Sequence, residues 1–460
     1  MSPLELKHHP LSMRTRMLAP TLLLLIGQAL GASPDQGEAL SAEETDAVRL
    51  LRTLRDPEAL PADVLGPELA ALGPGIVGCL LGVLESGSVP GVDGQGRQAL
   101  SESQSAVLLR GLTELGRPTV LPYVTERYEE PATPGERSAA ILVFGAVGEG
   151  SELRLMLDVA IAPEEVEGEP VEVMDATVAA ALRSSVTMLL TREPRSFREL
   201  DNAWSALPNF VLGELVLGVG ATHDPRALAF MDDVFERSPE MRERILSQVP
   251  LLGASEERAI NDSLASKILV QLNSEQESTL RAACLALGGL EDSRCVPRLV
   301  ELLGEGPPAV AQSAHWALGK LLNRQASASF GAWRAWLRDE QRWLREEEPT
   351  LLRQLRSAHE EEVLAALRAF SPRRLNRHEL AIEVGVVLTD PSERVRQMAC
   401  IVLAELGSRW SIRDLCGALD DQSDAVREAA QRALQVITGQ NLGADPESWR
   451  EVLAPAPERF

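Results

Sequence analysis

The sequence predicts an all-α fold, an α-solenoid of stacked antiparallel helix pairs. Small and apolar residues recur at an offset of 116 residues in the C-terminal part of the 460-residue chain, and at a shorter step of 31 residues inside each copy. Hydrophobic residues make up 45% of the chain but aromatic ones only 4%, so Ala, Leu and Val dominate. This composition favours helices over strands, and nested periods are typical of repeat arrays.

The 116-residue offset joins residues of similar character in two copies. The pairs are Ala283 with Ala399, Cys284 with Cys400, Leu287 with Leu403, Leu290 with Leu406, Ala314 with Ala430, Leu318 with Leu434, and Trp333 with Trp449. The 31-residue step runs from Ala283 to Ala314 and from Ala399 to Ala430. Because a helix pair of this length cannot bury its own apolar stripe, we expect each pair to stack on its neighbours.

The best-defined repeat begins with DPSERVRQMACIVLAELG, residues 390–407. Its apolar residues lie three or four positions apart and therefore share one helical face: Val395, Ala399, Val402, Leu403 and Leu406. Asp390 before Pro391 predicts the start of this helix, and Gly407 predicts its end. A second, shorter helix is expected over residues 411–421, after which the next repeat opens.

Each copy ends in a helix with a Trp at its fourth position. Asp445 is the expected cap before Trp449, and Ser329 is the expected cap before Trp333. Since a large aromatic side chain stabilises mainly through the area it buries, each Trp is predicted to cover the end of a two-repeat stack. A platform for a ligand is the alternative role.

These patterns divide the chain into six segments. They are an export signal (1–31), a leader of the mature chain (32–60), degenerate helical repeats (61–272), a two-repeat module with a Trp-containing end (273–345), connecting helices (346–389) and a second module with a Trp-containing end (390–460). Within the degenerate part, residues 86–98 and 162–172 read as loop insertions because they are rich in Gly, Pro and acidic residues.

The first 31 residues have the features of a cleaved signal peptide. Arg14 and Arg16 precede a short apolar run over residues 18–30, and small residues at Ala29 and Gly31 supply a cleavage site. Translation could start at Met1 or Met13, and a buried helix or a retained anchor is the alternative. We therefore expect an exported protein, periplasmic or extracellular. Because no other run approaches 18 apolar residues, no stable membrane insertion is expected after cleavage.

The charge balance excludes one class of partner. The formal net charge is −23, and removing the signal segment, which carries +2, leaves about −25. Such a surface repels the phosphate backbone, so nucleic acid is not an expected partner. The local basic run over residues 372–378 is short and is followed by Glu379, which predicts a solvated helix start.

The five cysteines form neither a CxxC pair nor a zinc spacing. Cys284 and Cys400 each follow an Ala in an apolar helix, which is typical of small core residues. An odd, sparse set argues against a disulfide scaffold, although a single bridge stays open.

The C-terminal repeats resemble the HEAT repeat, and in particular its short bacterial type. The resemblance rests on a shared Asp-x4-Val-Arg spacing, in which Asp390 precedes Val395 and Arg396, and Asp421 precedes Val426 and Arg427. It implies an α-solenoid in which these Asp and Arg side chains hydrogen-bond along the stack. The earlier module departs from the pattern, with Ser274 and Leu280 at the positions of the first Asp and Arg. The ending TGQNLGADPESWREVL also resembles the close of exported bacterial HEAT-repeat proteins.

Few residues indicate catalysis or metal binding. The His-Glu dipeptides at His359 and His378 resemble the iron-ligand pairs of the deoxyhypusine hydroxylase family, which has four such pairs. Here two stand 19 residues apart, which does not fit the 31-residue step. Solvated helix starts are therefore expected at both places, with no metal and no cofactor.

Together these observations predict a non-catalytic α-solenoid that binds or scaffolds a protein or peptide partner outside the cytoplasm. The alternative is a metal- or cofactor-dependent enzyme, hydroxylase- or lyase-like, built on the same type of solenoid. Exposed residues of a solenoid face carry no local signature, so the sequence does not identify the partner.

Overall fold

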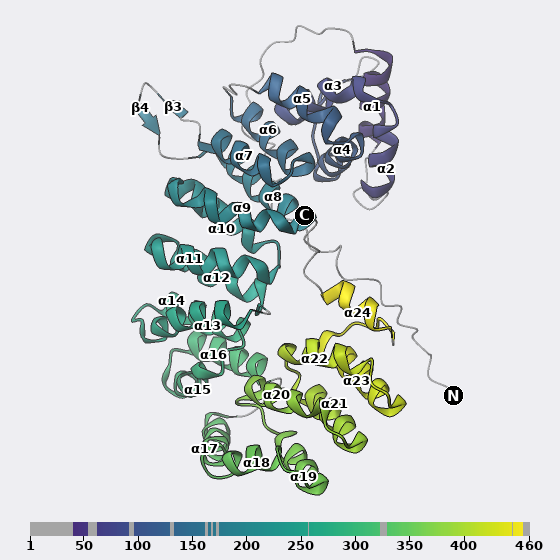
Figure 1. The fold of residues 1–460 in the computed structure, drawn as a ribbon. Helices are drawn as coiled ribbons and strands as arrows, with labels where there is room; N and C mark the ends of the chain where they lie inside the picture. The colour runs from purple at the N-terminus through teal and green to yellow at the C-terminus, as the bar shows by residue number, and fades with distance from the viewer. Residues whose placement is uncertain are drawn as a thin grey trace, which may run out of the picture. The chain divides into compact units, whose positions relative to one another are not determined.

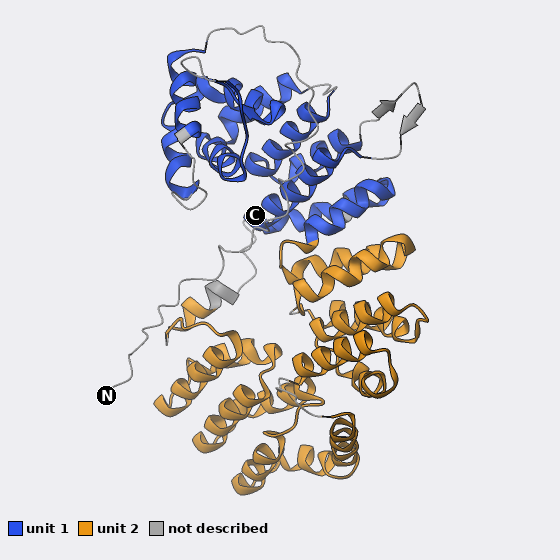
Figure 2. Cartoon of the chain, turned by 180° about the vertical axis from the view of Figure 1, so that it is seen from behind, with its two compact units in different colours: residues 1–219 blue, residues 220–460 orange. Residues whose placement is uncertain are grey.

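The computed structural model describes two compact units, residues 1–219 and 220–460 (Figure 2). The described residues are 40–53, 62–91, 96–128, 133–161, 164–166, 169–171, 174–255, 257–322, 329–443 and 445–453. The predicted export signal lies outside them. The other segment boundaries predicted from the sequence divide the chain more finely than these two units, and they stay predictions.

Unit 1 is a stack of helices with two short β-hairpins in its connections (Figure 1). Its elements are α1 (Ala42–Thr53), α2 (Ala62–Ala70), η2 (Pro74–Ile76), α3 (Val77–Ser86), β1 (Ser88–Val89), β2 (Gln98–Ala99), α4 (Glu102–Leu115), α5 (Arg117–Arg127), α6 (Pro134–Val147), α7 (Gly150–Ile161), β3 (Glu164–Val166), β4 (Glu169–Val171), α8 (Ala176–Arg192), η3 (Pro194–Ser196), α9 (Phe197–Ala203), η4 (Trp204–Ala206) and α10 (Asn209–Gly220).

Helices α2, α4, α6 and α8 pack one on the next and form one layer of unit 1. Two of them start at a capping box, in which Ser101 exchanges hydrogen bonds with Gln104, and Thr133 with Glu136. Gly145 lets α6 approach α8 closely, because a Cβ there would lie 2.5 Å from the Cα of Ser185. The layer therefore depends on small residues at its contacts as well as on apolar ones.

The two expected loop insertions contain the antiparallel hairpins. Strand β1 pairs with β2 in the register Ser88 to Ala99, and β3 pairs with β4 in the register Glu164 to Val171. Neither hairpin extends beyond two strands. Apart from these insertions, both units consist of helices, and the predicted all-α fold is confirmed.

Unit 2 continues as pairs of helices (Figure 1). Its elements are η5 (Pro225–Ala227), α11 (Leu228–Arg237), η6 (Pro239–Met241), α12 (Arg242–Leu252), α13 (Arg258–Leu269), η7 (Val270–Asn273), α14 (Glu277–Gly289), η8 (Ser293–Cys295), α15 (Val296–Glu305), α16 (Pro308–Leu321), α17 (Phe330–Glu346), α18 (Glu348–Gln354), α19 (Glu360–Phe370), α20 (Arg377–Val386), η9 (Val387–Thr389), α21 (Glu393–Leu406), η10 (Arg409–Ser411), α22 (Ile412–Ala418), α23 (Asp424–Thr438) and α24 (Pro446–Leu453).

The 116-residue offset is a repeat of secondary structure. Elements α14, η8, α15, α16 and α17 each begin 116 residues before α21, η10, α22, α23 and α24, respectively. The same offset joins buried residues of α13 and α20: Leu264 with Leu380, Ala265 with Ala381, and Ile268 with Val384. Unit 2 therefore contains two copies of one arrangement, which we call module A (α13 to α17) and module B (α20 to α24).

One hydrophobic cluster fills the C-terminal part of unit 2, from Trp343 to Trp449. It joins α17 and α19 to module B and includes Cys400 and Cys416. All five cysteines of the chain are free. Burial raises the pKa of the Cys400 thiol to about 12, as expected for a small core residue.

The predicted start of α21 needs a correction. Ser392, not Asp390, is the N-cap of this helix, and its hydroxyl accepts the Val395 N–H at 3.5 Å. The Asp390 carboxylate instead accepts the Ser392 N–H at 2.8 Å. This local turn satisfies the carboxylate two residues along the chain and leaves Pro391 outside the helix. The predicted end is correct, since Gly407 follows α21 with φ 64°.

No single helix among the described residues has both the length and the apolar composition to cross a membrane. One bent pair, Ala62–Ala70 with Pro74–Ser86, reaches that composition only when the two helices are taken together across a bend of 103°. Leu65, Leu69, Ile76 and Leu80 of this pair are buried in unit 1.

Candidate functional site

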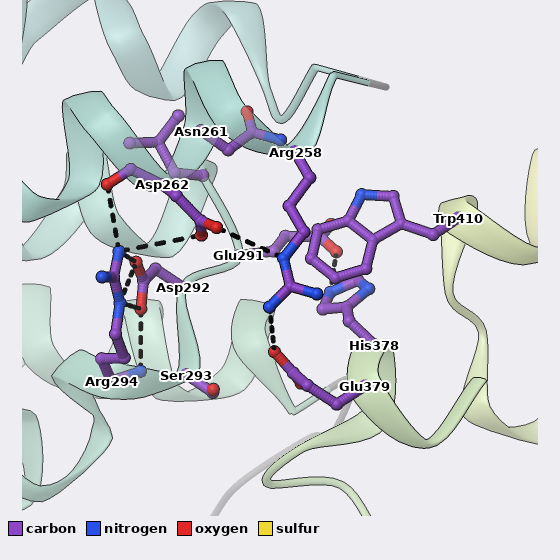
Figure 3. A pocket seen from close by; sticks show the side chains of 11 residues that line it. Arg258, Asn261, Asp262, Glu291, Asp292, Ser293, Arg294, His378, Glu379 and Trp410 are labelled. Atoms are coloured by element: carbon purple, nitrogen blue, oxygen red, sulfur yellow. Dashed lines mark hydrogen bonds and ion pairs between the residues drawn. The ribbon is translucent and has the colours of Figure 1, made fainter. Parts of the chain in front are cut away.

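A polar cavity of about 130 Å³ lies in unit 2 where modules A and B meet (Figure 3). Module A contributes α13 and the turn after α14, and module B contributes α20 and η10. The lining residues are Arg258, Asn261, Asp262, Leu290, Glu291, Asp292, Ser293, Arg294, His378, Glu379 and Trp410. We call this cavity and its rim the Trp410 cleft.

The two modules present equivalent turns to each other at this cleft, but with different residues. Asp292 caps η8 by accepting the Arg294 N–H at 2.8 Å. At the same position of module B, Ser408 caps η10 by accepting the Trp410 N–H at 3.3 Å. The shared backbone plan thus places a charged side chain on one wall and an indole on the other.

Arg377, the first residue of α20, joins both modules beneath the cleft. Its Nε donates to the carbonyl of Leu321 at 3.0 Å, and its Nη1 donates to the carbonyls of Leu406 and Gly407 at 3.2 and 2.7 Å. Its Nη2 contacts Glu291 Oε2 at 2.5 Å. The guanidinium therefore meets the negatively polarised C-terminal ends of α16 and α21 and the carboxylate that follows α14. We call this set of contacts the Arg377 node.

Glu291 supplies the negative charge of the Arg377 node, and its backbone conformation is unfavourable for a residue other than glycine. Its φ of 57° lies in the left-handed region, where module B has Gly407 at the equivalent position. A non-glycine residue with such a backbone is uncommon and often marks a functional or strained site. Burial alone would raise the pKa of Glu291. The hydrogen bond from His378 and the charges of Arg377, His378 and Arg409 outweigh the effect of burial and lower the pKa of Glu291 to about 2.

His378 forms the floor of the cleft. Its Nδ1 lies 2.8 Å from Ser408 Oγ, and its Nε2 lies 3.1 Å from Glu291 Oε2. The imidazole also faces the indole of Trp410, with ring centroids 4.7 Å apart and planes tilted by 45°. These contacts from both modules fix the orientation of Trp410 from below.

Arg258 covers the cleft from module A. Its guanidinium carbon lies 5.1 Å from the centre of the Trp410 ring, which is a cation–π contact. The same guanidinium pairs with Asp262 at 3.2 Å and with Glu379 at 3.5 Å (Figure 3). The cleft thus already holds one guanidinium between an aromatic face and two carboxylates.

The prediction that residues 372–378 are a solvated helix start is wrong. Arg377 and His378 are both buried, whereas His359, from the other His-Glu pair, is exposed. The physical reason is distance along the chain, because Glu291 is 86 residues from Arg377 and no local pattern records the contact. A comparison of the two modules does indicate that Arg377 is buried, because Asn261 of module A, which is buried, occupies the position of Arg377 in module B.

The arrangement offers charged and hydrogen-bonding groups for recognition. Among the described residues, no group of three or more His, Cys, Asp or Glu side chains could hold a metal ion. The carboxylates of the cleft are engaged by guanidinium groups, and His378 is held between Glu291 and Ser408. Such a site can bind a charged or hydrogen-bonding group.

The predicted Asp and Arg repeat positions meet in module B. Arg396 makes a bidentate ion pair with Asp421, with distances of 2.7 and 2.9 Å, and also donates to the Asp390 carbonyl at 2.9 Å. Arg427 donates to the Asp421 carbonyl at 2.6 Å. The hydrogen bond from Arg396 is the main reason that the pKa of Asp421 is lowered. These contacts link the first repeat of module B to the second.

The predicted apolar repeat positions are all buried. They are Ala283 and Ala314 in module A, and Val395, Ala399, Leu403, Val426, Ala430 and Leu434 in module B. None of them lines the Trp410 cleft. They hold the stack together, whereas most residues of the cleft, such as Glu291, Arg294 and His378, have no equivalent of the same type in the other module.

Both repeated tryptophans are buried at the start of the last helix of their module. Trp449 donates its Nε1–H to the Gly443 carbonyl at 2.8 Å and belongs to the C-terminal hydrophobic cluster. Trp333 packs edge-on against Trp336, with ring centroids 5.5 Å apart. In module A, α17 packs on α15, and in module B, α24 packs on the equivalent α22. This placement makes each Trp part of the packing and leaves it out of the cleft.

Comparison with known proteins identifies the type of repeat. A profile of HEAT repeats matches residues 348–435, which run from α18 to α23. No curated protein matches the sequence. Among solved structures, the chain is similar to an engineered protein, with 12% identity, a TM-score of 0.32 and coverage of 86% of this chain and 99% of that one. It is also similar to importin beta, with 14% identity, a TM-score of 0.37 and coverage of 90% of this chain and 56% of that one.

Proposed function

Taking as a premise that residues 348–435 are HEAT repeats within an α-solenoid, we propose that this protein is a non-catalytic scaffold that binds a protein partner outside the cytoplasm. HEAT-type stacks provide long surfaces of parallel helices, and such surfaces commonly bind other polypeptides. The proposal is supported by the surface of unit 2 rather than by any reactive group.

The observation that carries the proposal is the exposure of large apolar side chains on one helix beside the Trp410 cleft. Ile382 and Val386 of α20 are 42% and 60% exposed. They lie one helical turn apart, so they occupy the same face of the helix. Isolated exposed apolar residues are ordinary, but neighbouring ones beside a polar cleft are typical of a recognition surface.

Action outside the cytoplasm is the part of the proposal that rests on sequence. Its support is the basic n-region, the apolar run and the small residues before Ala32. N-terminal sequencing of the protein from its native compartment tests it. A mature chain that starts near Ala32 is expected, whereas a start at Met1 or Met13 would contradict export by cleavage.

A metal- or cofactor-dependent enzyme is the rival function. The enzyme hypothesis predicts that the purified protein carries about one or two metal ions per chain. These ions should be lost when His378 or His359 is changed. The scaffold proposal predicts no stoichiometric iron, zinc or manganese. Elemental analysis of the full chain separates the two, and a bound metal that depends on either His would favour the enzyme.

The direct test of the scaffold is quantitative capture with cross-linking. Tagged full-length protein, expressed at its native level, is cross-linked in intact cells and purified under denaturing conditions. A polypeptide recovered in a fixed ratio to the tagged chain supports the proposal. Recovery of no polypeptide above the background of an unrelated exported protein of similar charge would overturn it.

A further inference from the structure

The exposed side of α20 continues from the rim of the Trp410 cleft. Glu379, Ile382, Glu383 and Val386 are spaced three and four positions apart and form one face of the helix, which we call the α20 face. We propose that the α20 face and the Trp410 cleft bind an arginine-containing segment of the protein partner, and that an arginine of this segment takes the place of Arg258 over Trp410. This inference rests on the proposed scaffold function and names the chemistry of the partner.

The α20 face combines apolar and acidic groups. Ile382 and Val386 offer apolar contact area to a partner, and Glu379 and Glu383 stand beside them on the same face. Glu348 at the start of α18 lies close enough for the charges of Glu379 and Glu383 to act on it. Burial and then these two charges raise the pKa of Glu348. The surface therefore has an excess of negative charge that a cationic segment would relieve.

Gly385 brings a further carboxylate to the edge of α20. A Cβ at this position would lie 2.7 Å from Asp414 Oδ2, so the absence of a side chain lets Asp414 of α22 approach the helix. Burial raises the pKa of Asp414, and Arg413 offsets that effect only in part. The carboxylates near α20 thus come from three helices, α18, α20 and α22.

The cations now at this surface are held weakly. Arg356 pairs with Glu383 at 2.6 Å, but its side chain is 64% exposed. Arg258 pairs with Asp262 and Glu379, and its side chain is 48% exposed. Exposed ion pairs of this kind contribute little to stability, because both partners remain hydrated in the unpaired state and lose side-chain freedom on pairing. A partner's arginine that makes the same contacts with Trp410 and the carboxylates would compensate for the displacement of Arg258.

The contacts of Arg258 show which group the cleft fits. A guanidinium lies over the indole of Trp410 while carboxylates contact its edges, an arrangement that suits the planar Arg group better than the compact ammonium of Lys. His378 and Ser408 hold Trp410 in place beneath it, so the aromatic surface exists before a partner arrives. Apolar side chains flanking the partner's arginine would reach Ile382 and Val386. An acidic segment would instead meet the carboxylates near α20.

A synthetic probe tests this inference with the full-length chain. The probe is a fluorescein-labelled 12-residue peptide in which Arg and Leu alternate with Gly and Ser. Two control peptides replace every Arg by Lys or by citrulline, which keeps the shape of arginine without its charge. Fluorescence anisotropy should show the tightest binding for the Arg peptide, weaker binding for the Lys peptide and the weakest binding for the citrulline peptide. The citrulline peptide should bind at least tenfold more weakly than the Arg peptide. Equal binding of the citrulline peptide would overturn the role of charge.

Variants of the chain locate the site. The double change Glu379→Gln and Glu383→Gln should weaken the Arg peptide at least tenfold, whereas Glu275→Gln with Glu428→Gln, which removes two exposed carboxylates elsewhere in unit 2, should change binding less than twofold. Arg258→Gln should strengthen binding several-fold, because it removes the guanidinium that competes for Trp410. Unchanged or weaker binding by Arg258→Gln would contradict the displacement of Arg258. Matching circular dichroism and melting curves are required for every variant.

The same variants separate this inference from the scaffold function itself. If the partner captured from cells still binds the Glu379→Gln, Glu383→Gln chain with native affinity, the arginine site is wrong while the scaffold function stands. If no partner is captured by the unchanged chain, the scaffold function is wrong. Capture by the unchanged chain that is lost in this variant and kept in the Glu275→Gln, Glu428→Gln control supports both.

Discussion

Arg377 Nη2 lies 2.5 Å from Glu291 Oε2, although the two residues are 86 positions apart and belong to different modules. Their side chains are 5% and 13% exposed, and the guanidinium also contacts three carbonyl groups at helix ends. A buried ion pair gains little over apolar packing, but it strongly disfavours any arrangement in which one charge loses its partner. The Arg377 node therefore defines how module B sits on module A.

Removing the guanidinium should destabilise unit 2 strongly. We expect Arg377→Ala to lower the free energy of unfolding by about 3–5 kcal/mol, because it leaves the largely buried Glu291 carboxylate without its main cation. Chemical denaturation followed by circular dichroism measures this. Combining Arg377→Met with Glu291→Gln removes both charges and should cost less than either single change. A double variant as unstable as the sum of the singles would show that the two residues act independently.

The left-handed backbone conformation of Glu291 predicts a difference in stability between two substitutions. Glu291→Gly and Glu291→Ala both remove the carboxylate, but only glycine adopts the left-handed conformation without steric cost. Glu291→Gly should therefore be about 1 kcal/mol more stable than Glu291→Ala. Gly407→Ala, at the same position of module B with φ 64°, is the matched test and should cost about 1 kcal/mol. Equal stabilities of the two Glu291 variants would mean that the turn relaxes.

The lowered pKa of Glu291 predicts a loss of stability in acid. With a folded-state pKa of about 2, the carboxylate stabilises the fold by about 3 kcal/mol above its ordinary pKa, near 4.5. This contribution should decline as the pH falls from about 4.5 to 2, since the proton binds the unfolded chain first. Glu291→Gln should lack this part of the pH dependence. Parallel curves of unfolding free energy against pH for the two proteins would contradict the assignment.

The end-capping role of Trp449 is tested by a pair of substitutions. Trp449→Ala should cost about 3–5 kcal/mol, the usual range for a buried aromatic side chain. Trp449→Phe keeps most of the buried area and loses the bond to the Gly443 carbonyl, so it should cost less. Hydrogen exchange should show the loss of protection in residues 390–453 first, because stacked repeats are stabilised by their neighbours. Lost partner binding without lost protection would instead make Trp449 a ligand platform.

Sequence patterns predicted the helices better than the site, for a physical reason. The burial of Ala283, Ala399 and Trp449 follows from spacings within a few turns of helix, which the chain itself displays. The Trp410 cleft depends on contacts between residues 86 and 152 positions apart, such as Arg377 with Glu291 and Arg258 with Trp410. These pairs have no local period. These contacts are indicated only by comparing the two modules, because Arg377 of module B occupies the position of the buried Asn261 in module A.

The most direct test of the central claim is hydrogen exchange of the full chain with and without its captured partner. If the protein is a scaffold that binds through module B, the partner should slow exchange in α20 and η10, over residues 377–386 and 409–411, and leave α5 to α7 unchanged. The Glu379→Gln, Glu383→Gln variant should lose this protection. Protection confined to other helices, or no change in any helix at saturating partner, would contradict the account.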